Sequence, residues 1–146
     1  MCTDLRSKKV SQNQEQPVAE IVWWFPKTSE QYRFRGQMIL VGEETANEEK
    51  DLAIARKELW GNLSDPARES FLGSIVPGEA YQEEPAPSNI PVGGRDAEGK
   101  PVPPPKNFLL MLLDPTHVDY LLLSGDQYRQ KDVLTDGKWS LQRVNP

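Results

Sequence analysis

The chain has 146 residues, of which 37% are hydrophobic and 27% are charged, so it can build one hydrophobic core. Its formal net charge of −5 gives no general attraction to nucleic acid or to an anionic membrane, and no apolar run approaches the ~20 residues of a membrane helix. The single cysteine, Cys2, excludes an internal disulfide, and the N-terminus carries no apolar signal segment, so we expect a cytoplasmic protein.

Two strands joined by a short polar turn are predicted first. Residues 20–25 are rich in β-branched and aromatic side chains and stop at Pro26, which indicates a strand. Residues 31–41 alternate in polarity, as a half-buried strand does. The apolar face holds Tyr32, Phe34, Met38 and Leu40, and the polar face holds Gln31, Arg33, Arg35 and Gln37. We expect an antiparallel hairpin with the apolar face buried, because a one-residue slip would turn the arginines into the core.

Two helices are predicted next. Residues 45–48, Thr-Ala-Asn-Glu, have the form of a capping box at a helix N-terminus. The apolar residues that follow share one helical face: Leu52, Ala55, Leu59 and Trp60. A second helix should begin after Ser64 as N-cap, with Pro66 in its first turn, and end near Leu72.

The rest of the chain is predicted to be a long loop followed by strands. Residues 77–105 hold eight of the 13 prolines and four glycines, so we expect residues 77–106 to be an irregular loop insertion. Strands are predicted at residues 107–113, ended by Asp114-Pro115, at 118–123, and at 139–144 after an Asp136-Gly137 turn. The fold class is therefore mainly β (α+β), a small barrel with two helices.

A basic cluster, Arg6, Ser7, Lys8 and Lys9, stands out in this acidic chain. Guanidinium, hydroxyl and ammonium groups at adjacent positions can surround a phosphate with charge-assisted hydrogen bonds. A solvated run of charges is the alternative for this cluster, and an exposed sheet face is the alternative for the polar side of residues 31–41. A metal site is not expected, because the single histidine and the single cysteine are far apart in the sequence.

Several segments match one known family in order and spacing. They are residues 2–9, Pro17, residues 23–25 and 30–36, then Arg56, Trp60, residues 63–64, Arg68, Phe71, residues 77–78, Trp139 and residues 143–146. This arrangement resembles the pyridoxamine 5'-phosphate oxidase-like family of FMN-binding split β-barrels. The resemblance covers the whole chain and implies a split β-barrel of that type, with FMN as cofactor and a role as an oxidoreductase.

The resemblance also implies where FMN binds. Lys8 and Lys9 would hold the FMN phosphate, helped by Thr3 and Ser7. Gln31 would hydrogen-bond the edge of the isoalloxazine ring, for which a carboxamide offers both a donor and an acceptor.

Further contacts would come from the second subunit and from the last hairpin. Ser64 falls where the family contributes a polar contact across a homodimer, and Arg129 and Trp139 lie in the terminal hairpin that borders the flavin. Residues 1–146 would form one FMN-binding domain.

The chain also departs from the family. It begins at the phosphate motif, so we expect that the family's N-terminal helix and strands are missing. Where the oxidase that names the family has an Arg-x-His-Asp-Arg stretch for the substrate phosphate, only Arg129 and Asp132 persist, so pyridoxamine phosphate is not expected as the substrate. Three functions stay open: an FMN-dependent oxidoreductase of unknown substrate, a non-enzymatic flavin-binding or structural barrel, and a fragment that binds no cofactor.

Overall fold

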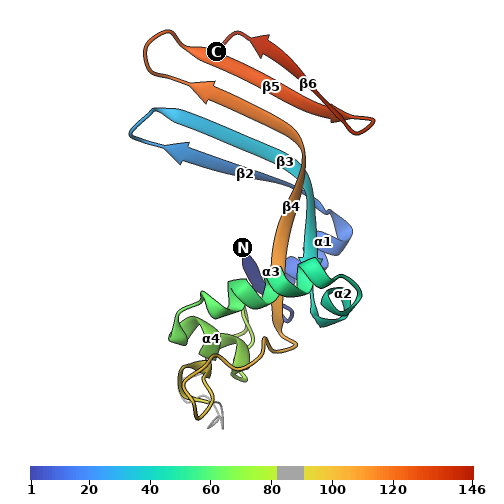
Figure 1. Cartoon of the computed structure of the whole chain (residues 1–146), viewed down its shortest axis with the longest axis vertical. Helices are drawn as coiled ribbons and strands as arrows, with labels where there is room; N and C mark the ends of the chain where they lie inside the picture. Colours follow the sequence, from blue (N-terminus) through green and yellow to red (C-terminus); the bar gives the residue numbers. More distant parts are fainter. Residues whose placement is uncertain (82–90) are drawn as a thin grey trace. The chain divides into compact units, whose positions relative to one another are not determined.

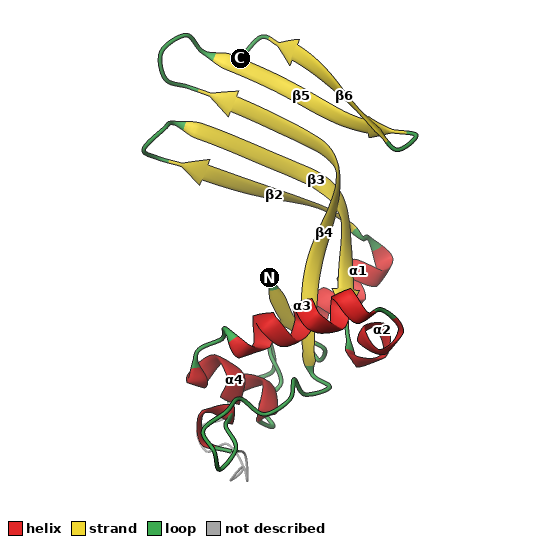
Figure 2. Ribbon diagram, in the orientation of Figure 1, coloured by secondary structure: helices red, strands yellow, loops and turns green. Residues whose placement is uncertain are grey.

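A computed structural model describes residues 1–81 and 91–146. It contains a six-stranded antiparallel sheet and several helices, which confirms the predicted fold class (Figures 1 and 2). In chain order the elements are β1 (Cys2–Asp4), α1 (Lys8–Glu15), β2 (Val18–Phe25), β3 (Glu30–Val41), α2 (Glu43–Glu48), α3 (Lys50–Gly61), α4 (Asp65–Leu72), the 3₁₀ turn η1 (Val92–Gly94), β4 (Phe108–Leu122), β5 (Tyr128–Thr135) and β6 (Lys138–Val144).

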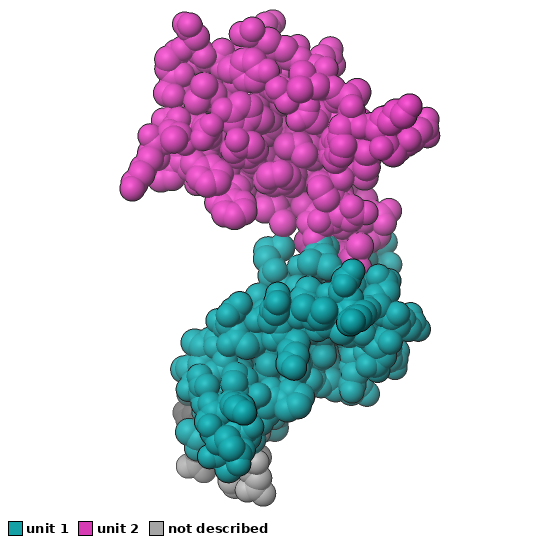
Figure 3. Space-filling model, viewed as in Figure 1, with its two compact units in different colours: residues 1–15, 40–112 teal, residues 16–39, 113–146 magenta. Residues whose placement is uncertain are grey.

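The chain divides into two compact units, which Figure 3 colours separately. Unit 1 consists of Met1–Glu15 and Leu40–Leu112, and unit 2 of Gln16–Ile39 and Leu113–Pro146. The long strands β3 and β4 each contribute residues to both units. The prediction that residues 1–146 form one domain stays a prediction.

The core of unit 1 lies between its helices and the paired strands β1 and β4. Val41, Ala46 and Leu110 are buried at its centre, and the predicted apolar face of α3 packs against them or nearby. An aromatic cluster extends this core: the rings of Trp60, Phe71 and Phe108 meet edge to face, with centroids 5.1–6.1 Å apart. This burial of large apolar surface stabilises the helices of unit 1.

Unit 2 is a single sheet in the strand order β2-β3-β4-β5-β6, with no helix among its residues (Figure 2). The predicted hairpin is confirmed, because β2 pairs antiparallel with β3 and Trp24 lies opposite Gln31. Arg33 and Arg35 are exposed, as the alternation predicts. Of the four residues expected to be buried, only Met38 is; Tyr32, Phe34 and Leu40 are half-buried. For Tyr32 and Phe34 a single-layer sheet explains this difference, because no second layer of unit 2 covers the aromatic face.

Strand β4 corrects the expectation that Asp114-Pro115 ends a strand. It runs unbroken through both residues, and Pro115 lies between the segment that pairs with β1 and the segment that pairs with β5. The missing N–H of proline therefore falls outside the segments that pair with β1 and β5. Gly36 of β3 allows the backbones of β3 and β4 to approach closely at this point, because a Cβ at residue 36 would lie 1.9 Å from the carbonyl oxygen of Asp114.

The helices differ from the prediction in number and in their boundaries. The predicted capping box does not start a helix: α2 begins at Glu43, Thr45 lies inside it, and the chain becomes extended at Glu49 before α3 starts. Packing of Ala46 into the core outweighs the local capping signal. Helix α4 has Ser64 as its N-cap, as predicted. Helix α1 and strand β1 are additional elements that the sequence pattern did not indicate.

The Pro/Gly-rich segment has little regular structure where it is described. Residues 77–81 and 91–106 contain only the short turn η1 and an isolated bridge between Arg95 and Pro101, which agrees with the prediction for that part. Residues 82–90 of the predicted loop lie outside the described residues. The later part of the segment is anchored, since Trp60 donates a hydrogen bond from Nε1 to the carbonyl of Val102 at 2.6 Å.

Candidate functional site

A cavity of about 540 Å³ opens in unit 1 between the N-terminal segment and helix α4. Thr3, Ser7 and Lys9 line one side of it, and Glu69 and Ser70 of α4 line another. Strand β1 holds Thr3 in place by pairing it with Leu109 of β4, so Thr3 is buried. Ser7 immediately precedes α1, and its hydroxyl accepts a hydrogen bond from the backbone N–H of Lys9 at 3.3 Å.

Some charged groups around this cavity have hydrogen-bond or ion-pair partners, and one does not. The Asp4 carboxylate accepts two side-chain hydrogen bonds from Arg6, at 2.9 and 2.7 Å, and this contact raises the pKa of Arg6. Glu69 Oε1 accepts a hydrogen bond from the backbone N–H of Gly93. In the part of the chain that the structure describes, the Lys9 ammonium has no hydrogen bond or ion pair. The cavity therefore offers one free cation and several hydroxyls, a donor set that suits an anionic oxygen group.

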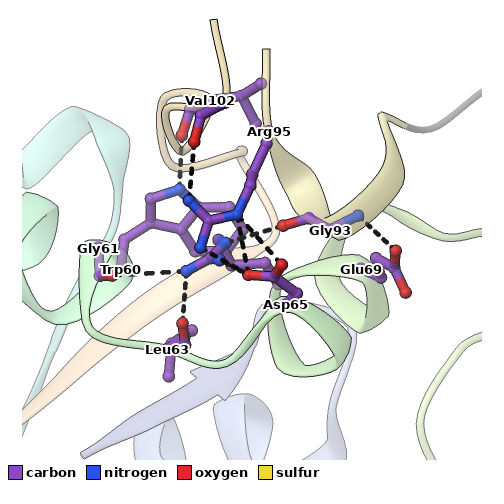
Figure 4. Close-up of polar contacts among 10 residues, drawn as sticks. Trp60, Gly61, Leu63, Asp65, Glu69, Gly93, Arg95 and Val102 are labelled. Atoms are coloured by element: carbon purple, nitrogen blue, oxygen red, sulfur yellow. Dashed lines mark hydrogen bonds and ion pairs between the residues drawn. The ribbon is translucent and has the colours of Figure 1, made fainter. Parts of the chain in front are cut away.

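The wall formed by α4 is fixed by a buried arginine, Arg68, whose partners Leu63, Asp65 and Gly93 are labelled in Figure 4. Arg68 is fully buried and donates to the carbonyl of Gly93 at 3.0 Å, to the carbonyl of Leu63 and to the carboxylate of Asp65. Arg95 donates to Asp65 as well, at 2.8 Å, and this hydrogen bond lowers the pKa of Asp65. The network ties η1 to α4 and so holds the helix that carries Glu69 and Ser70.

The structure brings together three of the five site residues predicted in unit 1. Thr3, Ser7 and Lys9 share the cavity, whereas Lys8 is exposed and is not part of its lining. Ser64 is exposed at the N-terminus of α4 and does not line the cavity either. Sequence reasoning missed the α4 residues of the wall. No motif marked them, because only the packing of α4 brings them to the N-terminal segment.

A second cavity, of about 170 Å³, lies on the sheet of unit 2 and contains two more predicted residues, Gln31 and Arg129. Arg33, Asp119 and Leu121 complete its lining. Arg129 donates from Nε and Nη2 to the two carboxylate oxygens of Asp119, at 3.0 and 2.8 Å. This bidentate contact lowers the pKa of Asp119, so that its carboxylate stays charged.

Gln31 is held by its neighbour on the same strand face. Arg33 donates from Nε to Gln31 Oε1 at 3.0 Å. Trp139 lies elsewhere on the sheet: it pairs with Leu134, five residues from Arg129, so alternation places it on the opposite face. Trp139 is half-exposed there.

Taken separately, each donor set has a chemistry that suits part of a flavin mononucleotide. Hydroxyls and an ammonium suit its phosphate, and a carboxamide suits the polar edge of its ring. Within residues 1–81 and 91–146, no group of three or more His, Cys, Asp or Glu side chains could hold a metal ion. None of the described helices is long and apolar enough to cross a membrane.

Comparison with known proteins gives a consistent set of relatives. Residues 1–42 match the family model described as "Pyridoxamine 5'-phosphate oxidase, FMN-binding domain". Pyridoxine/pyridoxamine 5'-phosphate oxidase 2 of Arabidopsis thaliana is 28% identical over 148 residues, which cover 99% of this chain and 70% of that protein.

Two solved structures are similar to the whole chain. One is the crystal structure of a pyridoxamine 5'-phosphate oxidase-related, FMN-binding protein from Nostoc punctiforme, with 39% identity and a TM-score of 0.75 over 99% of this chain and 71% of that one. The other is PhzG from Burkholderia lata in complex with tetrahydrophenazine-1-carboxylic acid, with 19% identity and a TM-score of 0.72 over 100% of this chain and 67% of that one. At that lower identity, the second likeness shows the fold alone.

Proposed function

Because the chain belongs to the pyridoxamine 5'-phosphate oxidase-related family of FMN-binding proteins, we propose that it binds FMN and acts as an FMN-dependent oxidoreductase. One observation supports this most strongly. The unit 1 cavity has an unpartnered Lys9 ammonium beside two hydroxyls, while both carboxylates in its lining already have partners. A phosphate entering it would meet a free cation, while Asp4 is paired with Arg6 and Glu69 accepts a hydrogen bond from the backbone N–H of Gly93.

In this proposal Lys9, Ser7 and Thr3 hold the FMN phosphate, with Lys8 adding charge from outside the cavity. Gln31 contacts the ring edge, while Arg129 keeps Asp119 ionised and fixed beside it. When bound, FMN supplies the redox chemistry, by exchange of a hydride with the substrate. The protein contributes binding, orientation and charge. Ser64 and Trp139 line neither cavity, and their flavin contacts are proposed on the family resemblance alone.

A non-enzymatic flavin-binding protein is the second candidate, and one observation favours it. Every carboxylate that lines the two cavities is engaged within the chain: Asp4 with Arg6, Glu69 with Gly93, and Asp119 with Arg129. Neither cavity therefore presents an uncommitted carboxylate as acid or base. Direct hydride transfer needs none, so turnover must decide between the candidates: peroxide release with candidate amines supports an oxidase, and bound flavin without turnover supports a binding protein.

We also propose that the working form is a cytoplasmic homodimer. The sheet of unit 2 leaves large apolar side chains in contact with solvent, among them Trp23 at 59% and Trp139 at 50% exposure. Burying such side chains against a second copy would be favourable, at roughly 25 cal/mol per Å² of apolar surface. A single species of dimer mass in sedimentation analysis would support this, and a monomer that binds FMN at full affinity would contradict it.

Titration of FMN into the chain tests the proposed cofactor site, followed by quenching of flavin fluorescence. Lys9→Ala should weaken binding roughly tenfold to a hundredfold, because a charge-assisted hydrogen bond to phosphate contributes about 1.5–3 kcal/mol. Lys8→Ala should cost less, since Lys8 lies outside the cavity lining. Lys57→Ala, an exposed residue of α3, is the matched control and should bind like the unmodified chain. Equal affinity in all three variants would mean that the basic cluster is only solvated charge.

A further inference from the structure

The contact between Arg33 and Gln31 fixes which end of the Gln31 carboxamide is available to a ligand. Arg33 Nε always carries a hydrogen and can only donate. The atom of Gln31 that it contacts at 3.0 Å must therefore be the oxygen, whichever way round the amide would otherwise be placed. Among the described residues, the Gln31 NH₂ group has no partner, so both of its hydrogens are free.

The position of Arg33 is itself constrained. Arg33 and Gln31 are two residues apart on β3, so their side chains leave the same face of the sheet. Both line the small cavity of unit 2, where Asp119 is clamped by Arg129. The Asp119 carboxylate is close enough to Arg33 for the guanidinium to contribute to the lowered pKa of that acid. Arg33 thus donates to the Gln31 oxygen and also acts electrostatically on a fixed anion.

We propose that Arg33 is a positioning residue that turns Gln31 into a hydrogen-bond donor toward the ring of the cofactor. The claim rests on the proposed binding of FMN, and it sharpens the expectation that Gln31 offers both a donor and an acceptor. A second N–H that approached the Gln31 oxygen would meet the positive charge of Arg33. The site therefore selects an acceptor on the ligand, a carbonyl oxygen or an unprotonated ring nitrogen.

The first test needs no cofactor. The side-chain NH₂ resonances of Gln31 are measured by NMR in the chain itself, in Arg33→Met and in Arg35→Met. Arg35 is the matched control, because it is an exposed arginine on the same face of the same strand and has no contact with the Gln31 side chain. We expect Arg33→Met to shift the Gln31 amide signals toward those of a glutamine whose side chain exchanges between rotamers without a fixed hydrogen bond. Arg35→Met should leave the signals in place. Unchanged signals in Arg33→Met would overturn the proposal.

The second test uses FMN as the probe. Arg33→Met should displace the absorption bands of bound flavin and weaken binding roughly threefold to tenfold, the effect of one lost hydrogen bond. Arg33→Lys should restore part of both, since an ammonium can still donate to the Gln31 oxygen. A bound flavin whose bands are the same in Arg33→Met would overturn the role of Arg33. Failure of the unmodified chain to bind FMN, with the Gln31 signals behaving as expected, would instead refute the proposed cofactor.

Discussion

Replacing Gly36 with alanine would test a close approach of the β3 and β4 backbones in unit 2. The new Cβ would lie 1.9 Å from the carbonyl oxygen of Asp114 and 2.7 Å from the Cα of Pro115. Both contacts are with backbone atoms of β4, so no side chain can rotate aside and the strands themselves must move. Overpacking costs about 1–3 kcal/mol when neighbours can adjust. We expect the free energy of unfolding to fall by about 3 kcal/mol, at the upper end of that range, because the backbone atoms of β4 cannot rotate aside.

Urea denaturation followed by tryptophan fluorescence measures this loss. With a slope of about 1–3 kcal/mol per molar urea, the midpoint should fall by roughly 1–3 M. Gly61→Ala is the control: it lies at the end of α3, a Cβ there meets nothing within 4 Å, and alanine favours the helix by up to about 1 kcal/mol. If Gly36→Ala unfolds at the same urea concentration as the unmodified chain, the inferred close approach of the β3 and β4 backbones is wrong.

Three more changes have expected outcomes. Arg68→Met should lower the free energy of unfolding by about 3–5 kcal/mol in urea titrations, because it removes a buried charge from an ion pair and from several carbonyls. Glu30→Gln should bring the pKa of Tyr120, raised to about 12 by its hydrogen bond to Glu30, back toward ~10 in an absorbance titration. Asp119→Asn should remove a stabilisation that exists above the ordinary carboxyl pKa of ~3.9 and is lost as pH falls through the lowered pKa of the folded state. Acid denaturation curves should therefore be flatter below pH ~4 in that variant, and an unchanged curve would contradict the effect of Arg129 on Asp119.

Local patterns were enough to predict the elements whose own residues decide their structure. The strict alternation of β3 gave its pairing and its exposed arginines, since one face had to be apolar. Ser64 and Pro66 marked the start of α4, and the prolines predicted the lack of regular structure that residues 77–81 and 91–106 largely show. The pattern of elements already indicated a small barrel, and the family resemblance added FMN and the split form of the barrel.

Features that depend on tertiary packing escaped the sequence. Pro115 lies inside a strand, between the segments that pair with β1 and β5, and only the paired structure reveals that position. The α4 wall of the unit 1 cavity carries no motif, since Glu69 and Ser70 reach the cavity only through the docking of α4 by Arg68. Likewise, which end of the Gln31 carboxamide is free to form a hydrogen bond depends on the position of the Arg33 side chain.

Strand β2 has a consequence for how this chain behaves at high concentration. It is the outermost strand of the unit 2 sheet, and its last four residues, Val22, Trp23, Trp24 and Phe25, are uncharged and exposed. Natural sheet edges are usually protected by lysine, proline or a bulge, and this stretch has none of them before Pro26. Such a strand is a template for β-augmentation by any other extended segment. We therefore expect this edge to promote aggregation unless another strand pairs with β2 first. A charged residue in place of Val22 should slow that aggregation.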